Sequence, residues 1–232
     1  SFLVLKEIDW ATPASILEKI IAYEAVHEIN SWSELRSRLE PEDRRCFAFF
    51  HPLIANEPLI FVEVAFTNNM PRKIDEVIKI DRSVMSEEDI STAVFYSISS
   101  CQDGLSGISF GNFLIKEVVY KLKRKNEALE KFVTLSPAPD FTKWLKEQSI
   151  DEDMDEESLM KQAMTYLLYS NREDGFPNDP VARFHLGNGA TLARINLNAD
   201  MSLKGIYQSK GMMVNYLYDP DSLEKNHELF FK

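Results

Sequence analysis

The middle of the chain constrains the fold most, because a strand-like run, a glycine-rich turn and an amphipathic helix follow one another directly there. Residues 92–100 are predicted to form a buried strand, and apolar residues recur at helical spacing over 113–123. Between these segments stand Gly104, Gly107 and Gly111. A strand that enters a helix through such a turn points free backbone N–H groups at one spot, which suits a phosphate group. The pattern alone is equally typical of an ordinary strand-to-helix turn.

The remaining segments predict an α/β (α+β) fold, with a mixed sheet of about seven strands and helices on both faces. Thr12, Asp140 and Asp179 are each predicted to cap a helix. The order of elements, β-α-α-β-β-β-α-β-α-β-β, resembles that of the GNAT acyltransferase superfamily. The predicted strands cover residues 2–10, 45–50, 59–67, 92–100, 132–135, 191–198 and 211–218, and the predicted helices cover 13–27, 31–39, 113–123, 141–145, 158–169 and 180–185.

Composition excludes several classes of function. The 232 residues carry a formal net charge of −11, which disfavours a nucleic-acid partner. Cys46 and Cys101 each lie in an apolar run and are predicted to be reduced and buried, in an intracellular protein. The histidines and cysteines show no metal-ligand spacing, so we expect no metal. No apolar run approaches a membrane span, and the acidic run at 151–157 is predicted to be an exposed connector and helix start.

Four polar side chains are candidates for chemistry. Ser136 directly follows a predicted strand, although a serine beside prolines is most often a turn residue. His185 lies near a helix end and before a glycine turn, where a packed histidine is the commoner explanation. Tyr216 and Tyr218, on the last strand, are more often core and edge aromatics. The tryptophans, Trp10, Trp32 and Trp144, are predicted to lie in the core.

Several segments resemble the malonyl-CoA decarboxylase family: residues 95–99, 111–116, 135–145, 178–190, 194–196, 199–200 and 202–218. The likeness runs from residue 2 to about residue 218 and implies the GNAT-like catalytic domain of that family, over residues 1–232. The first residue is Ser1 rather than methionine, so we expect that the helical domain preceding the catalytic domain in the family is missing here. The stretch between residues 145 and 178 is also expected to be short for the family.

The resemblance implies roles for individual residues. His185 matches the catalytic proton donor of the family, Ser136 its catalytic serine, described as proton acceptor, and Tyr218 a tyrosine near the reacting group. Ser109 stands where some members carry a glutamate. The segment that matches the CoA-phosphate turn consists of Ser106, Gly107, Ile108, Ser109, Phe110, Gly111 and Asn112.

The sequence therefore predicts decarboxylation of malonyl-CoA to acetyl-CoA and CO2 without a cofactor. We expect His185, with a pKa near neutrality, to be the general acid, and Ser136 to orient the malonyl carboxylate rather than to act as a base. The alternatives are a CoA-dependent acyltransferase and an inactive CoA-binding or oligomerisation module. We expect the protein to form a homo-oligomer and to bind neither nucleic acid nor a membrane. Its expected location is the cytoplasm, or the mitochondrion or peroxisome in a eukaryote.

Overall fold

Two units make up the structure, a computed structural model that describes residues 3–54, 56–101, 111–151 and 153–232. The first unit comprises residues 1–71 and 76–132, and the second comprises 72–75 and 133–232. A short helix, α3 (Asp75–Ile78), begins at the boundary between them.

The first unit contains a four-stranded antiparallel sheet. β1 (Val4–Ile8) pairs with β2 (Arg44–Phe50), β2 with β3 (Pro58–Thr67), and β3 with β4 (Thr92–Ser100). The inner strands are buried along most of their length, because helices cover both of their faces. The predicted hairpin over residues 45–67 is confirmed.

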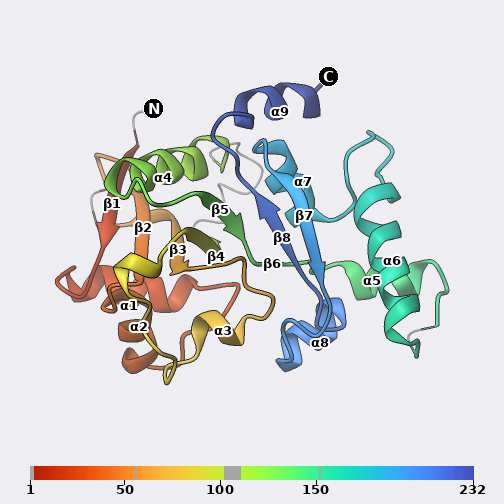
Figure 1. The fold of residues 1–232 in the computed structure, drawn as a ribbon, viewed down its shortest axis with the longest axis horizontal. Helices are drawn as coiled ribbons and strands as arrows, with labels where there is room; N and C mark the ends of the chain where they lie inside the picture. Colours follow the sequence, from red (N-terminus) through yellow and green to blue (C-terminus); the bar gives the residue numbers. More distant parts are fainter. Residues whose placement is uncertain (1–2, 55, 102–110, 152) are drawn as a thin grey trace. The chain divides into compact units, whose positions relative to one another are not determined.

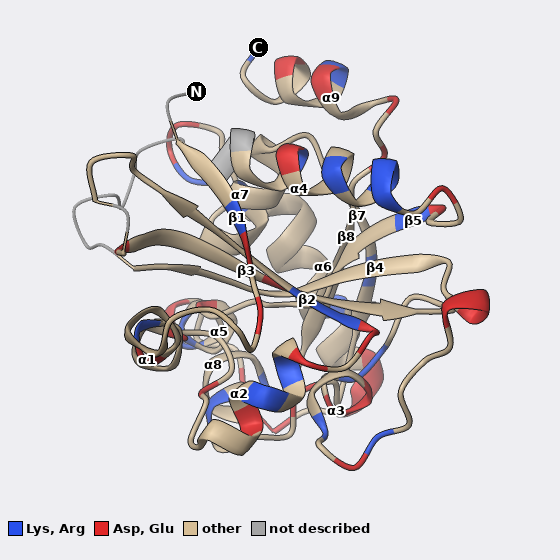
Figure 2. Ribbon diagram, turned by 90° about the vertical axis from the view of Figure 1, so that its left-hand side faces the viewer, with Lys and Arg blue, Asp and Glu red and all other residues tan. Residues whose placement is uncertain are grey.

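Three helices cover this sheet, two on one face and one on the other (Figure 2). α1 (Ala14–Tyr23) and α2 (Trp32–Leu39) pack apolar residues onto one face. α4 (Gly111–Lys125) lies on the opposite face. The residues of α4 that were predicted to form its apolar face are all buried: Leu114, Val118, Val119 and Leu122. A single 3-10 turn, η1 (Glu87–Asp89), precedes β4.

The second unit is built around β8 (Met213–Leu217). β5 (Lys131–Thr134), which begins at the unit boundary, β6 (Ser136–Pro137) and β7 (Thr191–Asn196) each pair with β8 in antiparallel orientation. Figure 1 shows β7 beside β8, with α8 (Leu203–Ser209) at one end of the pair. The other helices are α5 (Phe141–Glu147), α6 (Glu156–Tyr169), α7 (Pro180–Gly187) and α9 (Leu223–Phe230).

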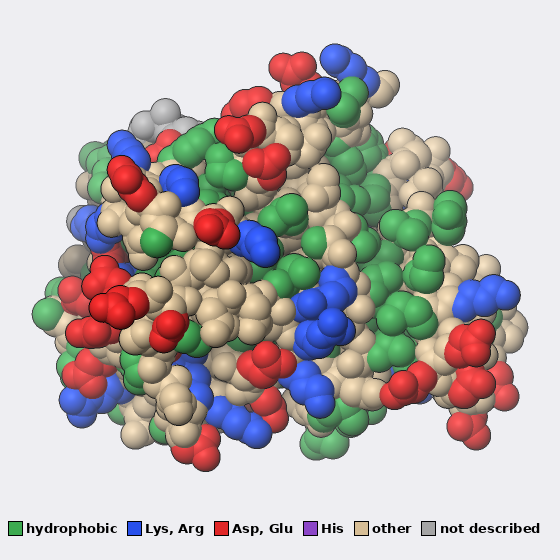
Figure 3. All heavy atoms as spheres, in the orientation of Figure 1, with side chains coloured by type: hydrophobic (Ala, Val, Ile, Leu, Met, Phe, Trp, Pro, Cys, Tyr) green, Lys and Arg blue, Asp and Glu red, His purple; other side chains and the backbone are tan. Residues whose placement is uncertain are grey.

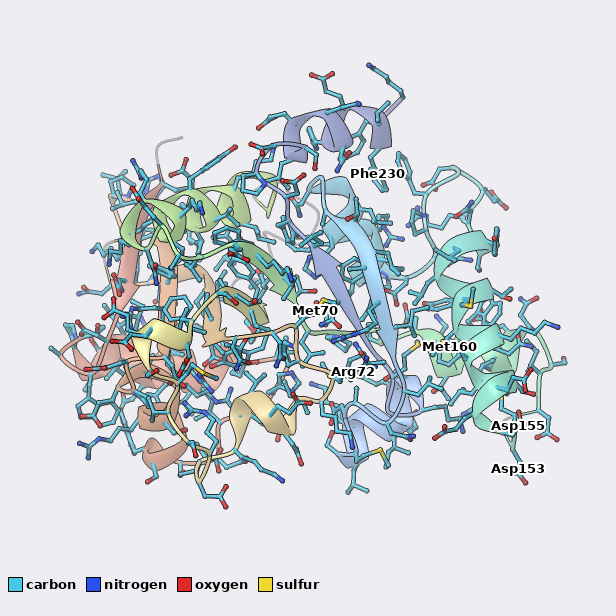
Figure 4. All side chains as sticks on the ribbon, viewed as in Figure 1. Met70, Arg72, Asp153, Asp155, Met160 and Phe230 are labelled. Atoms are coloured by element: carbon cyan, nitrogen blue, oxygen red, sulfur yellow. The ribbon has the colours of Figure 1, made fainter. Side chains whose placement is uncertain are left out.

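Helix packing in this unit is visible in the side chains. Met160 points from α6 toward β7, and Phe230 points from α9 toward α7 (Figure 4), where it lies against Gly187. Acidic side chains gather at the start of α6 (Figure 3), where Asp153 and Asp155 extend from the surface (Figure 4). Asp155 caps α6 by accepting a hydrogen bond from the Ser158 N–H, so the predicted acidic helix start is confirmed.

Several local predictions were wrong. Thr12 does not cap α1, because its hydroxyl bonds to Asp9 instead, and Asp140 makes no side-chain cap bond to α5. α1 ends at Tyr23 rather than near residue 27, and α8 and α9 were missed. Trp144 is buried as predicted, but Trp10 and Trp32 are exposed and pack edge to face against each other.

Cys46 and Cys101 are free and buried, as predicted. The described part of the chain contains no helix long and apolar enough to cross a membrane.

Candidate active site

His185 is presented by the last turn of α7. Asp179 caps this helix by accepting a 2.7 Å hydrogen bond from the Ala182 N–H, and Pro180 occupies the first turn, as the sequence predicts. The helix ends through Gly189, whose φ of +85° is unfavourable for other residues. A Cβ atom at Gly189 would lie 2.2 Å from the Leu223 carbonyl oxygen, so glycine is required there. Both ends of the helix are therefore fixed, and with them the position of the imidazole.

Ser136 reaches His185 from the neighbouring sheet. It is the first residue of β6 and is held by pairing with Val214 of β8. Its Oγ atom lies 3.0 Å from His185 Nε2, although 49 positions separate the two residues in sequence. The two residues identified through the family resemblance are therefore in hydrogen-bond contact.

Tyr218 completes a chain of three polar groups. Its hydroxyl lies 2.7 Å from His185 Nδ1, so each ring nitrogen of His185 has a hydroxyl partner. The hydroxyls of Ser136 and Tyr218 can each donate or accept, so either tautomer of the neutral imidazole is satisfied. We call Ser136, His185 and Tyr218 the hydroxyl–imidazole chain.

Tyr216 forms one wall of this site. Its ring stacks on the His185 imidazole at a centroid distance of 4.7 Å and an interplanar angle of 27°, and Phe184 meets the imidazole edge-on at 5.1 Å. The Tyr216 hydroxyl is buried and has no hydrogen-bond partner within the described residues. The sequence interpretation of Tyr216 as a core aromatic is correct for its burial but missed its contact with the imidazole.

Burial sets the protonation of the chain. It lowers the pKa of His185 from 6.5 to about 3, and it raises the pKa of Tyr218 well above its ordinary value. The predicted histidine pKa near neutrality was therefore wrong, because loss of solvent outweighs any stabilisation of the imidazolium by the helix end. At neutral pH the imidazole and the phenol are both uncharged.

A second hydrogen-bonded pair lies at the start of α7. The Tyr166 hydroxyl donates to Asp179 Oδ2 at 3.1 Å, and burial raises the pKa of Asp179 to about 6. Sequence inspection identified Asp179 as a cap but gave no signal for Tyr166. Within the described ranges, no three His, Cys, Asp or Glu side chains are grouped in a way that could hold a metal ion.

The predicted CoA-phosphate turn lies largely outside the described residues. Ser106, Gly107, Ile108, Ser109 and Phe110 are not described, while Gly111 and Asn112 begin α4. Phosphate binding by this segment stays a prediction, as does any role of Ser109.

Comparison with known proteins places the chain in a family. The family described as "Malonyl-CoA decarboxylase C-terminal domain" matches residues 1–156 and 147–232. The chain belongs to the malonyl-CoA decarboxylase family. The resemblance seen in the sequence is thereby confirmed.

Two curated members of the family show how much of it the chain represents. Mitochondrial malonyl-CoA decarboxylase of Anser anser anser is 38% identical over 264 residues, covering 94% of this chain and 52% of that protein. The Mus musculus protein is 36% identical, covering 94% of this chain and 54% of its own length. The chain thus spans about half the length of the curated relatives it matches. Because each alignment is longer than the 232 residues of the chain, these relatives carry residues within the aligned region that the chain lacks.

Solved structures extend the comparison. Malonyl-CoA decarboxylase from Rhodopseudomonas palustris matches with a TM-score of 0.92 and 48% identity, over 99% of this chain and 63% of that one. The loading GNATL domain of CurA from Lyngbya majuscula matches with a TM-score of 0.65 and 14% identity, over 95% of this chain and 99% of that one. The second likeness concerns the fold alone, and it confirms the predicted GNAT-like fold.

Proposed function

We propose that this chain decarboxylates malonyl-CoA to acetyl-CoA and CO2 without an external cofactor, with residues 1–232 acting as one catalytic domain. The observation that carries the proposal is the buried hydroxyl–imidazole chain in a member of the malonyl-CoA decarboxylase family. His185 is the proton donor, Ser136 binds the malonyl carboxylate, and Tyr218 fixes the imidazole.

The protein has to supply two things for this reaction: a fixed orientation of the substrate and one proton. The thioester carbonyl accepts the electron pair as the bond to CO2 breaks, so the substrate is its own electron sink. The protein has to hold the breaking C–C bond perpendicular to the thioester plane and then protonate the α-carbon. A positioned general acid typically contributes about 10²- to 10⁴-fold to the rate.

The uncharged state of His185 suits this chemistry. An imidazolium beside the malonyl carboxylate would stabilise the substrate more than the transition state, in which negative charge moves to the thioester oxygen. With a pKa of about 3, His185 offers no such cation at neutral pH. The Ser136 hydroxyl can donate to the carboxylate without holding it as an ion pair would.

The proton can follow the hydrogen bonds. When the Tyr218 hydroxyl donates to Nδ1, the proton of the imidazole lies on Nε2, on the Ser136 side. The enolate is a far stronger base than a phenolate, so it takes the Nε2 proton while Nδ1 receives the proton of Tyr218. The malonyl group and the hydroxyl–imidazole chain together carry one negative charge before and after CO2 leaves. A proton from water restores the Tyr218 hydroxyl when the product departs.

The test is turnover of malonyl-CoA, followed as released CO2 and as acetyl-CoA formed. We expect turnover by the wild-type chain. We expect Ser136→Ala to weaken malonyl-CoA binding more than acetyl-CoA binding, because acetyl-CoA lacks the carboxylate. Equal weakening of both ligands would remove Ser136 from carboxylate binding. Acetyl transfer to an amine acceptor without CO2 release would identify an acyltransferase instead.

A further inference from the structure

The strand that delivers Ser136 is interrupted just before it. Val133 pairs with Leu217, and Ser136 pairs with Val214, in one continuous register. Between these pairs β5 ends at Thr134, and Leu135 belongs to neither β5 nor β6. Something other than regular strand pairing must therefore hold the chain in place immediately before the serine.

Two side chains span this interruption. Thr134 Oγ1 accepts a 3.1 Å hydrogen bond from the Tyr216 backbone N–H, and the Thr134 carbonyl oxygen accepts a 2.7 Å bond from Asn215 Nδ2. Both residues are completely buried. The side chains of Thr134 and Asn215 thus supply cross-strand bonds at the position where regular β5–β8 pairing stops.

Asn215 is itself held from the opposite side. Its Oδ1 atom accepts bonds from Arg194 Nε at 3.1 Å and from Asn196 Nδ2 at 2.8 Å, both of which belong to β7. This fixes the amide with its nitrogen toward Thr134. Three strands therefore meet at this one side chain.

Thr134 also connects two walls of the site. It precedes Ser136 by only two residues, so the two residues are linked through a short stretch of backbone. The backbone N–H that it accepts belongs to Tyr216, whose ring stacks on His185. A change at the Thr134 hydroxyl is therefore transmitted to Ser136 through the strand and to His185 through the tyrosine ring.

We infer that Thr134 and Asn215 are positioning residues that set the Ser136–His185 contact, an inference that rests on the proposed function for its effect on turnover. Neither residue needs to touch the substrate for this role. A misplacement of about 1 Å in a catalytic group costs about 100-fold in rate, so loss of either bond is expected to lower kcat by about 10- to 100-fold.

The experiment compares Thr134→Val with Thr134→Ser and with a matched control, Thr142→Val. Valine keeps the size of threonine and removes the acceptor, whereas serine keeps the hydroxyl. Thr142 is buried on α5, and its hydroxyl has no hydrogen-bond partner within the described residues, so the same substitution there breaks no bond. The measurements are kcat and KM for malonyl-CoA, CoA affinity, thermal unfolding, and ¹⁵N and ¹H shifts of the His185 ring.

We expect Thr134→Val to lower kcat with KM and CoA affinity within a few-fold, and to shift the His185 ring signals. Thr134→Ser should restore both properties, and Thr142→Val should match the wild type. A Thr134→Val variant with wild-type kcat and unchanged ring signals would overturn the inference. If the wild type has no turnover, the proposed function fails, and the ring signals alone decide whether Thr134 positions His185.

Asn215→Asp provides the second test, because it keeps the size of the side chain and removes the amide donor to the Thr134 carbonyl. We expect the same loss of kcat and a similar shift of the ring signals. If neither Thr134→Val nor Asn215→Asp folds, the pair determines the fold rather than the contact, and the inference is overturned.

Discussion

Two buried polar clusters, one in each unit, handle charge in different ways. In the first unit, Arg38 Nη1 bonds to Glu63 Oε2 at 3.0 Å, and Ser97 Oγ lies 2.8 and 2.7 Å from the two carboxylate oxygens of Glu24. We call these four residues the carboxylate cluster. In the second unit, the hydroxyl–imidazole chain holds no carboxylate and no permanent cation.

The charges of the carboxylate cluster do not balance. It contains two carboxylates and one guanidinium, and the Glu24 carboxylate also accepts the N–H groups of Val26 and His27 at 2.8 Å each. Burial, together with the neighbouring charge of Glu24, raises the pKa of Glu63 to about 8. Glu63 is therefore mostly protonated at neutral pH.

The comparison separates a cluster that holds a fold from one that is free to react. In the first unit the Arg38 guanidinium is the cation of the carboxylate cluster, so removing it leaves the buried carboxylates without that partner. The hydrogen bonds of the second cluster are satisfied while its groups are neutral, so it can bind the proposed anionic substrate without first breaking an ion pair. Four predictions test this distinction.

The largest expected effect is on turnover. His185→Gln is expected to lower malonyl-CoA turnover by about 10²- to 10⁴-fold, because the proposed proton donor is lost. The unfolding free energy should change by about 1 kcal/mol or less, since the glutamine amide can still bond to neighbouring hydroxyls. Steady-state kinetics and urea denaturation measure the two effects. His51→Gln, in the loop after β2, is the matched control, and near-normal turnover of His185→Gln would remove His185 from the mechanism.

In the first unit the corresponding change affects stability. Arg38→Met leaves Glu63 without its ion-pair partner and is expected to cost about 3–5 kcal/mol at pH 8, measured by urea denaturation. The loss should be smaller at pH 5, where Glu63 is protonated in any case. Arg36→Met on the same helix is the control, because its pair with Glu40 is exposed to solvent and is expected to contribute little to stability. Equal losses in the two variants would contradict the importance of burial.

Sequence inspection could predict the alternation of strands and helices because apolar periodicity follows directly from burial of one face. It missed α8, a seven-residue helix. That helix depends on the close approach of Gly205 to Asp200, where a Cβ atom would lie 2.4 Å from the Asp200 carbonyl oxygen. Such a close local contact of glycine with the backbone leaves no pattern of apolar periodicity.

The candidate site was predictable in part. Ser136 and His185 were candidates from their positions in the sequence, and the family resemblance implied their roles. The structure adds that they are in hydrogen-bond contact. The pKa of His185 could not be predicted, because it depends on burial beneath Tyr216, a residue distant in sequence. The proposed positioning role of Thr134 could not be predicted for the same reason. The sequence does not show which backbone N–H group donates a hydrogen bond to the hydroxyl of a buried threonine.

The two clusters are expected to change the free energy of unfolding with pH in opposite directions. The contribution of Glu63 falls as pH rises, and the contribution of His185 falls as pH drops. The folded pKa of Glu63 is raised from 4.5 to about 8, so its contribution is complete below pH 4.5 and is lost as pH rises toward 8. The folded pKa of His185 is lowered from 6.5 to about 3, so its contribution is complete above pH 6.5 and is lost as pH falls toward 3.

Each group contributes a slope of at most about 1.4 kcal/mol per pH unit, which urea denaturation at a series of pH values can measure. Glu63→Gln should flatten the decline as pH rises toward 8, where His185 is mostly deprotonated in both the folded and the unfolded state. His185→Gln should flatten the rise between pH 3 and 4.5. If Glu63→Gln leaves the alkaline slope unchanged, Glu63 is not the residue that holds the extra proton.

The smallest expected effect comes from the same substitution made once in each cluster. Ser97→Ala removes a donor to a charged carboxylate and should cost about 1.5–3 kcal/mol, while Ser136→Ala breaks a bond between neutral groups and should cost about 0.5–1.5 kcal/mol. Urea denaturation of both variants at pH 7 measures a difference of about 1 kcal/mol. Turnover should show the reverse order, since Ser136 is proposed to bind the malonyl carboxylate and Ser97 lies in the other cluster.

A Ser136→Ala variant that loses more stability than Ser97→Ala, with its turnover intact, would mean that the hydroxyl–imidazole chain stabilises the fold as the carboxylate cluster does. The distinction between the two clusters would then be lost.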